Sequence, residues 1–179
     1  IPVMAVPRHA EKEIEHFGQI TNAVGWIGPA SFRKIDYLPM LHNLKKKLPH
    51  LKHIILIDEA GQPEKPGFES YQKILSQVKT GKHVDILEKY TPDPMEVSHL
   101  LPTGGTTGLP KLVPRTHNNY LTNAYFNGTA TERNSKDCDL IVTPVAHNAG
   151  LLRWVSRMVW GGKLVLSNST RPADILDRI

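Results

Sequence analysis

Hydrophobic residues in the first third of the chain follow two spacings in turn, one typical of strands and one typical of helices. Short apolar runs predict strands at residues 2–6, 25–30 and 53–58. Apolar residues three or four apart predict two helices between them, one over 9–24 and one that ends at Pro49. Their buried faces are expected to consist of Ile14, Phe17, Ile20 and Val24 in the first helix, and Leu38, Leu41, Leu44 and Leu48 in the second. This order predicts an α/β fold, and the β-branched run 53–58 is typical of a strand in a parallel sheet.

The rest of the chain continues the alternation with less regular spacing. After a loop at residues 59–67, the pattern predicts a helix over 68–78 and strands at 98–101, 139–145 and 162–168. Further helices are expected at 118–130, at 150–160 and from Pro172 onward. Because the sequence contains no repeat, low-complexity tract or long linker, residues 1–179 are interpreted as one α/β subdomain with a parallel, Rossmann- or flavodoxin-like sheet.

Composition narrows the class of protein without identifying its chemistry. The 179 residues are 40% hydrophobic and 22% charged, and no apolar run reaches the roughly 18 residues that span a bilayer. The net charge of +5 comes from scattered Lys and Arg, without a basic stripe interleaved with aromatic residues. Neither a membrane nor a nucleic acid is therefore expected as a partner. The single cysteine, Cys138, is expected to be a small packed residue, and its lack of a disulfide partner fits a cytoplasmic location.

One loop, residues 103–111, combines little bulk with three threonine hydroxyls and a terminal cation; it reads TGGTTGLPK. Its glycines let the backbone approach a ligand closely, and hydroxyls and backbone amides can donate to phosphate oxygens. Lys111 adds a compact positive charge. We therefore interpret the loop as a site for a triphosphate or pyrophosphate rather than as a flexible surface loop. It is not a Walker A loop, because Pro110 precedes the lysine and Leu112 follows it, and the dinucleotide Gly-x-Gly-x-x-Gly spacing also fails.

The same nine residues resemble the phosphate-loop motif of the adenylate-forming (ANL) superfamily of AMP-binding enzymes, which includes acyl-CoA synthetases, luciferases and peptide-synthetase adenylation domains. The doubled glycine, the continuation LVPRTHNNY and the Ala-His-Asn triplet at 146–148 resemble one branch, the 2,3-dihydroxybenzoate-AMP and salicylate-AMP ligases of siderophore biosynthesis. The stretches IPVMAVPRH and LPHLKHIILI are similar to that branch as well. The resemblance implies an acyl-CoA-synthetase-like large domain, of which residues 1–179 would form one N-terminal α/β subdomain, with the C-terminal domain absent.

The resemblance also implies a role for each motif residue. The loop would hold the β and γ phosphates of ATP, and Lys111 and His147 would be the catalytic residues. His147 and Asn148 would bind the acid, with the Asn148 amide facing an ortho hydroxyl. No residue is expected to hold a metal ion. The expected phosphate-binding residues are Thr103, Gly104, Gly105, Thr106, Thr107, Gly108 and Lys111.

The reaction implied by the resemblance is attack of a carboxylate on the α-phosphorus of ATP, which forms an aryl- or acyl-adenylate and releases pyrophosphate, with Mg²⁺ accompanying ATP. The identity of the acid is left open, and so is the acceptor: CoA, the phosphopantetheine of an acyl or aryl carrier protein, or neither. The alternatives are an AMP-forming CoA ligase for an aromatic, alicyclic or fatty acid, and a nucleotide-binding module without chemistry. The family's Thr-Gly-Asp ribose segment and C-terminal lysine are absent from residues 1–179, so this chain alone is expected to be inactive.

The remaining conspicuous side chains are assigned structural roles. Trp154 and Trp160 are expected in the core rather than lining an aryl pocket, and the aspartates within 137–139 are expected in a turn before a strand. Arg115 and His117 also match the branch, and they are expected to orient the loop or to cap the helix that follows.

Overall fold

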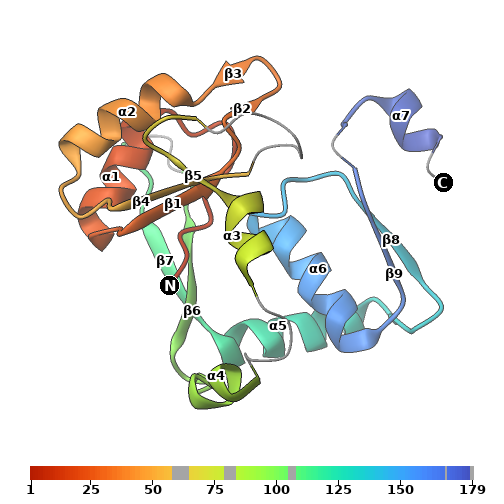
Figure 1. Ribbon diagram of the computed structural model, residues 1–179. Helices are drawn as coiled ribbons and strands as arrows, with labels where there is room; N and C mark the ends of the chain where they lie inside the picture. The colour runs from red at the N-terminus through yellow and green to blue at the C-terminus, as the bar shows by residue number, and fades with distance from the viewer. Residues whose placement is uncertain (58–64, 79–83, 105–107, 168, 178–179) are drawn as a thin grey trace. The chain divides into compact units, whose positions relative to one another are not determined.

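The computed structural model describes residues 1–57, 65–78, 84–104, 108–167 and 169–177, which form two compact units (Figure 1). Unit 1 comprises Ile1–Val6 and Pro92–Ile179, and unit 2 comprises Pro7–Thr91. Both combine helices with parallel strand pairs, which confirms the predicted α/β class. Among the described helices, none has the length and apolar character needed to cross a membrane. That the chain forms one subdomain of a larger adenylation domain stays a prediction.

Unit 2 is built on a three-stranded parallel sheet in the order β1-β4-β5, beside a short antiparallel pair, β2 and β3. The strands are β1 (Gly25–Gly28), β2 (Ser31–Phe32), β3 (Ile35–Asp36), β4 (His53–Leu56) and β5 (Glu69–Ser70). The helices are α1 (Glu11–Thr21), α2 (Leu38–Lys47), α3 (Tyr71–Gln77) and α4 (Val84–Lys89). Residues 58–64, which include most of the predicted loop, lie outside the described residues.

The core of unit 2 follows the predicted leucine face of α2 more closely than the predicted face of α1. Leu41 and Leu44 are fully buried, and Leu48 is buried just beyond the helix. In α1, by contrast, Ile20 is 54% exposed, and the helix ends at Thr21, after which Asn22 takes a left-handed conformation. Gly18 is buried instead, since a Cβ there would lie 2.5 Å from the Leu48 side chain. The predicted helix over 9–24 was therefore too long, and Val24 is also exposed.

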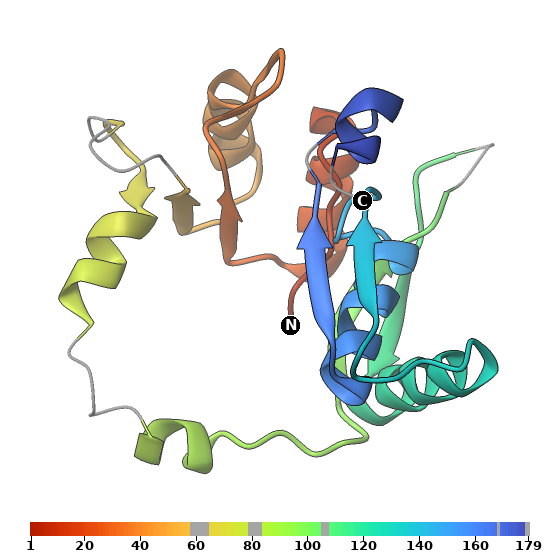
Figure 2. The same ribbon diagram turned by 90° about the vertical axis from the view of Figure 1, so that its right-hand side faces the viewer.

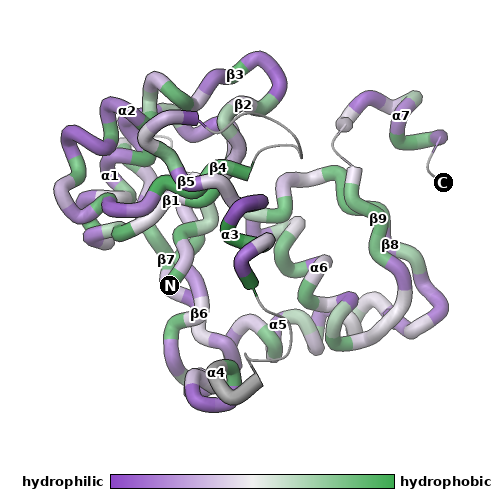
Figure 3. The backbone as a smooth tube through the Cα atoms, in the orientation of Figure 1, coloured by the Kyte–Doolittle hydropathy of each residue, from purple (hydrophilic) through white to green (hydrophobic). Residues whose placement is uncertain are grey.

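Unit 1 contains an antiparallel hairpin, a parallel strand pair and two packed helices. The strands are β6 (Val97–Pro102), β7 (Leu112–Thr116), β8 (Cys138–Ile141) and β9 (Lys163–Leu166). The helices are α5 (His117–Ala130), α6 (Asn148–Trp160) and α7 (Pro172–Leu176). Figure 2 shows β8 and β9 side by side with α6, which connects them along the chain, packed against them. Hydrophobic residues run along β8, β9 and α6 (Figure 3).

The hydrophobic core of unit 1 joins the hairpin to both long helices. Leu101 of β6, Tyr120 of α5 and Leu151 of α6 are buried together, and the partly buried residues packed on them are Met4, Leu152 and Val155. Farther along the same helices, the buried Ser156 hydroxyl donates to the Ala124 carbonyl at 3.1 Å. This core fixes the first turn of α6 relative to the strand that precedes the phosphate loop.

Several sequence-based expectations for unit 1 need correction. The predicted strand at 2–6 is reduced to a parallel bridge between Val3 and Leu100, because Pro2 and Pro7 lack the N–H groups that a longer ladder needs. The predicted strand at 139–145 ends at Ile141, and a turn containing Pro144 follows. Cys138 is exposed rather than packed, and Trp154 is 41% exposed rather than in the core.

Candidate active site

The predicted phosphate loop connects the two antiparallel strands of the β6–β7 hairpin. Two hydrogen bonds close its neck beyond the last strand pair, Pro102 with Leu112. The Thr103 N–H donates to the Lys111 carbonyl at 2.8 Å, and the Lys111 N–H donates to the Thr103 hydroxyl at 3.0 Å. The two ends of the predicted motif are therefore brought together, and the threonine at its start has a structural partner.

The described residues of the loop interior lie on either side of residues 105–107. Gly105, Thr106 and Thr107 lie outside the described residues. Gly104 and Gly108 are exposed, and a Cβ built on either would meet nothing within 4 Å. The Lys111 side chain is also exposed. The described part of the loop thus offers open backbone and a cation to a ligand.

The Ala-His-Asn triplet lies in the turn between β8 and α6. The His147 N–H donates to the Pro144 carbonyl at 2.9 Å, and the His147 side chain caps α6 by accepting at Nδ1 from the Ala149 N–H at 3.3 Å. With Nδ1 as the acceptor, the proton of the neutral ring is on Nε2, where it can be donated to an anionic oxygen. Gly150 allows the tight turn, because a Cβ there would lie 2.4 Å from the Pro144 carbonyl oxygen.

Tyr120 connects the triplet to the hairpin, and the sequence analysis gave it no role. Its hydroxyl donates toward Asn148 and lies 3.2 Å from both the side-chain Oδ1 and the backbone carbonyl. The ring is only 3% exposed. His99 of β6 contacts it edge-on, with ring centroids 4.6 Å apart, and the Arg115 guanidinium of β7 lies 5.4 Å from the ring centre. One buried side chain therefore touches both strands of the hairpin and the Ala-His-Asn triplet.

The surroundings of Tyr120 keep its hydroxyl protonated. Burial raises the pKa of Tyr120 to about 12, although the nearby Arg115 charge lowers it in part. His99 is buried beside it, and this burial, together with the positive charges of Arg115 and His117, lowers the pKa of His99. Ser98 fixes the tautomer of this histidine: its hydroxyl donates to the Arg115 carbonyl at 2.9 Å and so accepts from His99 Nδ1 at 2.7 Å. At neutral pH, Tyr120 is a hydrogen-bond donor and His99 is uncharged.

Arg115 and His117, which follow the loop, do not form the predicted cap of α5. Thr116, not Arg115 or His117, caps α5, because its hydroxyl accepts from the Asn119 N–H at 3.1 Å. Arg115 instead covers the Tyr120 ring. A tyrosine at the first turn of a predicted helix reads as an ordinary core residue, so its contact with Asn148 gave no sequence signal.

Among the described residues, no hydrogen bond or ion pair joins Lys111 directly to His147 or Asn148; the hairpin and the triplet are joined through Tyr120 and the core around Leu101. Figures 1 and 2 show the end of β6 and the start of α6 at the same end of unit 1. The arrangement allows a polyphosphate held at the loop and an acid held at the triplet to occupy one end of this unit.

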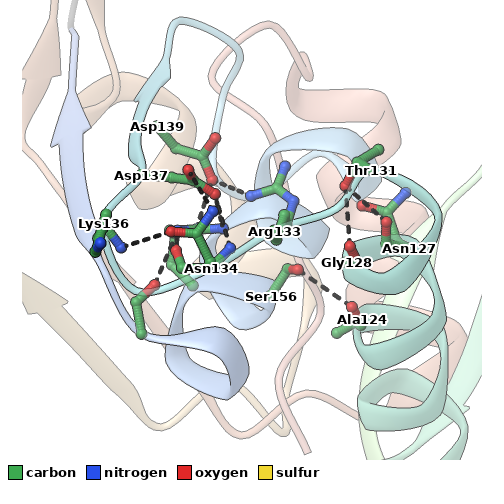
Figure 4. A network of polar contacts seen from close by, with 12 residues as sticks. Ala124, Asn127, Gly128, Thr131, Arg133, Asn134, Lys136, Asp137, Asp139 and Ser156 are labelled. Carbon is green, nitrogen blue, oxygen red and sulfur yellow. Dashed lines mark hydrogen bonds and ion pairs between the residues drawn. The ribbon is translucent and has the colours of Figure 1, made fainter.

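A second polar cluster, at the other end of α6, serves the fold (Figure 4). Arg157 is 4% exposed, and its Nη1 donates to the carbonyls of Asn134 and Gly161, both at 2.9 Å. Its Nε lies 2.9 Å from a carboxylate oxygen of Asp139, which also pairs with Arg133. Asp139 was interpreted as a turn residue, but it is a partner of a buried arginine. Among the described residues, no group of three His, Cys, Asp or Glu side chains could hold a metal ion.

Comparisons with known proteins agree with this fold. The apo structure of MbtA from Mycobacterium smegmatis superposes with a TM-score of 0.84 at 26% identity, over 100% of this chain and 32% of that one. The salicyl-AMP ligase / salicyl-S-ArCP synthetase of Mycobacterium tuberculosis is 34% identical over 148 residues, which is 83% of this chain and 24% of the relative. The 2,3-dihydroxybenzoate-AMP ligase of Bacillus subtilis is 30% identical over 97% of this chain and 30% of its own length.

The chain therefore spans between 24% and 32% of the length of these proteins. The model of the family described as AMP-binding enzyme matches residues 1–179, the full length given. With a phosphate-type loop on the hairpin and the Ala-His-Asn triplet at α6, the chain belongs to the AMP-binding enzyme family.

Proposed function

We propose that the complete protein carrying this chain uses ATP to adenylate an aryl acid with an ortho hydroxyl, such as salicylate or 2,3-dihydroxybenzoate, and releases pyrophosphate. The observation that carries the proposal is the link through Tyr120, which ties the acid-binding triplet to the hairpin of the phosphate loop. The names of the two relatives at 34% and 30% identity, a salicyl-AMP ligase and a 2,3-dihydroxybenzoate-AMP ligase, support the same class of acid.

The two parts of the site have different tasks in this reaction: the loop stabilises the leaving pyrophosphate, and the triplet positions the acid. A carboxylate oxygen of the acid attacks the α-phosphorus, a new P–O bond forms, and the bond to pyrophosphate breaks. Negative charge builds up on the leaving pyrophosphate, where the amides and hydroxyls of the loop and Lys111 stabilise it. At the acid, the Nε2–H of His147 donates to the carboxylate and holds it in place. The Asn148 amide contacts the ortho hydroxyl, so an acid without this group would leave a polar group unpaired.

Mg²⁺ is expected to arrive with the nucleotide. The described residues offer no cluster of three ligands for a metal, and Mg²⁺ commonly binds through substrate phosphates and water rather than in an all-protein cage. For the acceptor, the name of the Mycobacterium tuberculosis relative includes a salicyl-S-ArCP synthetase activity. We therefore favour transfer to the phosphopantetheine thiol of an aryl carrier protein over transfer to CoA.

The test is ATP–pyrophosphate exchange by the complete protein with salicylate, 2,3-dihydroxybenzoate, benzoate, cyclohexanecarboxylate and a fatty acid, each with and without CoA. We expect exchange mainly with the two ortho-hydroxylated acids, and no dependence on CoA. Equal exchange with the other acids, together with AMP release that requires CoA, would instead assign the protein to the CoA ligases. ATP binding without exchange for any acid would leave it a nucleotide-binding module.

A further inference from the structure

The contact between Tyr120 and Asn148 fixes more than the position of the amide. A side-chain amide has one acceptor end, the oxygen, and one donor end, the NH₂ group. The Tyr120 hydroxyl lies 3.2 Å from the amide oxygen Oδ1 and donates to it. Among the described residues, no partner is found for the NH₂ group of Asn148, which is exposed. The oxygen is therefore occupied by the protein, and the donor end is left for a ligand.

Tyr120 cannot easily give up this contact. Its ring lies in the core with Leu101 and Leu151, between His99 and Arg115. The same hydroxyl is also 3.2 Å from the backbone carbonyl of Asn148, so its single proton is shared between two acceptors of one residue. The raised pKa of Tyr120, which burial causes, keeps the proton on the hydroxyl throughout the neutral range.

We propose that Tyr120 is a positioning residue that turns the donor end of the Asn148 amide toward the bound acid, and that it thereby selects an acid whose ortho group is a hydrogen-bond acceptor. This inference rests on the proposed function, because it requires Asn148 to face the acid. It adds two points: the Asn148 amide acts as the donor in its contact with the acid, and Tyr120 sets that orientation.

The orientation of the Asn148 amide matters because ortho-substituted benzoates differ in whether the ortho group presents a hydrogen-bond acceptor or a donor. In salicylate, the phenolic proton bonds internally to the carboxylate, so the oxygen directs its lone pairs outward, toward a donor. In anthranilate, the amine uses one N–H internally and directs the other outward, toward an acceptor. An amide NH₂ group matches salicylate and opposes anthranilate, because two donors that face each other leave both unpaired. Benzoate presents neither group.

The experiment compares kcat/KM for acid-dependent ATP–pyrophosphate exchange by the complete protein with salicylate, anthranilate and benzoate. The unsubstituted protein is expected to prefer salicylate to both other acids. Tyr120→Phe removes the hydroxyl and keeps the ring, so the amide is no longer held in one orientation. We expect the salicylate-to-anthranilate ratio to fall about 10-fold, as for the loss of one oriented hydrogen bond, and benzoate to change less than about 2-fold.

A matched control is available on the same helix. Tyr125→Phe also removes a tyrosine hydroxyl from α5, but this ring is half exposed and stacks on Trp160, with centroids 5.2 Å apart. It should leave the ratio unchanged. If Tyr120 acts through Asn148, adding Tyr120→Phe to Asn148→Ala should not change selectivity further. Asn148→Asp, which offers only acceptor oxygens, gives a second test that leaves the buried ring intact: it should shift the preference from salicylate toward anthranilate.

The outcomes separate the inference from the proposed function. If the unsubstituted protein shows exchange with no preference for ortho-hydroxylated acids, or no exchange, the proposed function fails and the inference fails with it. If that preference is present but Tyr120→Phe and Asn148→Asp both keep the full salicylate-to-anthranilate ratio, only the inference is overturned. Loss of the ratio in Tyr120→Phe but not in Tyr125→Phe supports it.

Discussion

At the residue scale, single side chains decide which parts of the candidate site are held together. Thr103 is an example, because its backbone and its hydroxyl both bond to Lys111. The resemblance gives this threonine a role in phosphate binding, whereas the structure adds a role in closing the neck of the loop. The cation at the end of the motif is therefore kept next to its first residue by two hydrogen bonds that no ligand is needed to form.

Thr103→Val tests this role in the neck. Valine keeps the shape of the side chain but cannot accept from the Lys111 N–H, so the loop loses one of its two closing bonds. We expect KM for ATP in the exchange assay to rise about 5-fold, which corresponds to roughly 1 kcal/mol for one hydrogen bond. Thr103→Ser keeps the hydroxyl and should stay close to the unsubstituted protein. An unchanged KM in the valine variant would show that the neck bond does not matter for ATP.

Residue-scale chemistry was only partly predictable from the sequence. The motif residues carry chemical types that suit phosphate and acid binding, so they could be proposed from their order along the chain, and their assigned roles stay predictions. The role of Tyr120 could not be proposed, because it depends on α6 bringing Asn148 to within 3.2 Å of a helix 28 residues earlier in the chain. Gly105, Thr106 and Thr107 lie outside the described residues.

At the scale of elements, α6 has the proposed acid-binding residues at its start and a structural cluster at its end. The Ala-His-Asn triplet runs up to its first residue, Asn148, and its last turn holds the buried Arg157. Arg157 bonds to the loop before β8 and to Gly161 after the helix, and it pairs with Asp139 in β8 itself. This cluster anchors the helix to the strand pair that it connects, and so it supports the position of the triplet.

Replacing Arg157 with leucine should destabilise this unit. The substitution removes the Arg157 donor from the carbonyls of Asn134 and Gly161, of which Asn134 keeps only the Asp137 N–H, and it removes one of the two cations beside Asp139. Removal of one partner from a buried ion pair costs about 3 kcal/mol or more in the free energy of unfolding. Urea denaturation followed by circular dichroism measures it. Arg153→Leu is the control, because Arg153 lies on the exposed side of the same helix. It should change this free energy by less than about 0.5 kcal/mol. Equal effects of the two variants would contradict the role of the cluster.

The two long helices of unit 1 were predicted well, and two strands near prolines were not. The helices at 118–130 and 150–160 correspond to α5 and α6 within two residues at each end, because apolar side chains recur along each helix without a proline. The predicted strand at 139–145 failed after Ile141, where Pro144 cannot donate to a ladder and its carbonyl instead accepts from His147. Hydropathy alone does not distinguish an apolar strand from an apolar turn.

At the scale of the whole molecule, the chain divides between two units in a way that local pattern could not reveal. The first residues do not join the sheet of the strands that follow them, since the Met4 N–H donates to the Leu100 carbonyl at 2.9 Å and Val3 bridges the same residue. Such a pairing joins residues nearly 100 positions apart, and the apolar run at 2–6 gives no indication of its partner. The α/β alternation predicted the class of fold, but not which strands share a sheet.

The last prediction at this scale concerns the activity of the isolated 179-residue chain. Residues 1–179 contain the neck of the predicted phosphate loop and the triplet proposed to bind the acid, yet they cover only 24% of the length of the salicyl-AMP ligase that they resemble. In-line attack requires the acid, the α-phosphorus and the leaving pyrophosphate to be held together. The Thr-Gly-Asp ribose segment and the C-terminal lysine that the resemblance implies are not in this sequence. We therefore expect the 179-residue polypeptide to give no ATP–pyrophosphate exchange with salicylate under conditions in which the complete protein does, with circular dichroism confirming that the short chain is folded. Exchange by the folded short chain would mean that the loop and triplet suffice for adenylation, and the roles proposed for the missing segments would have to be withdrawn.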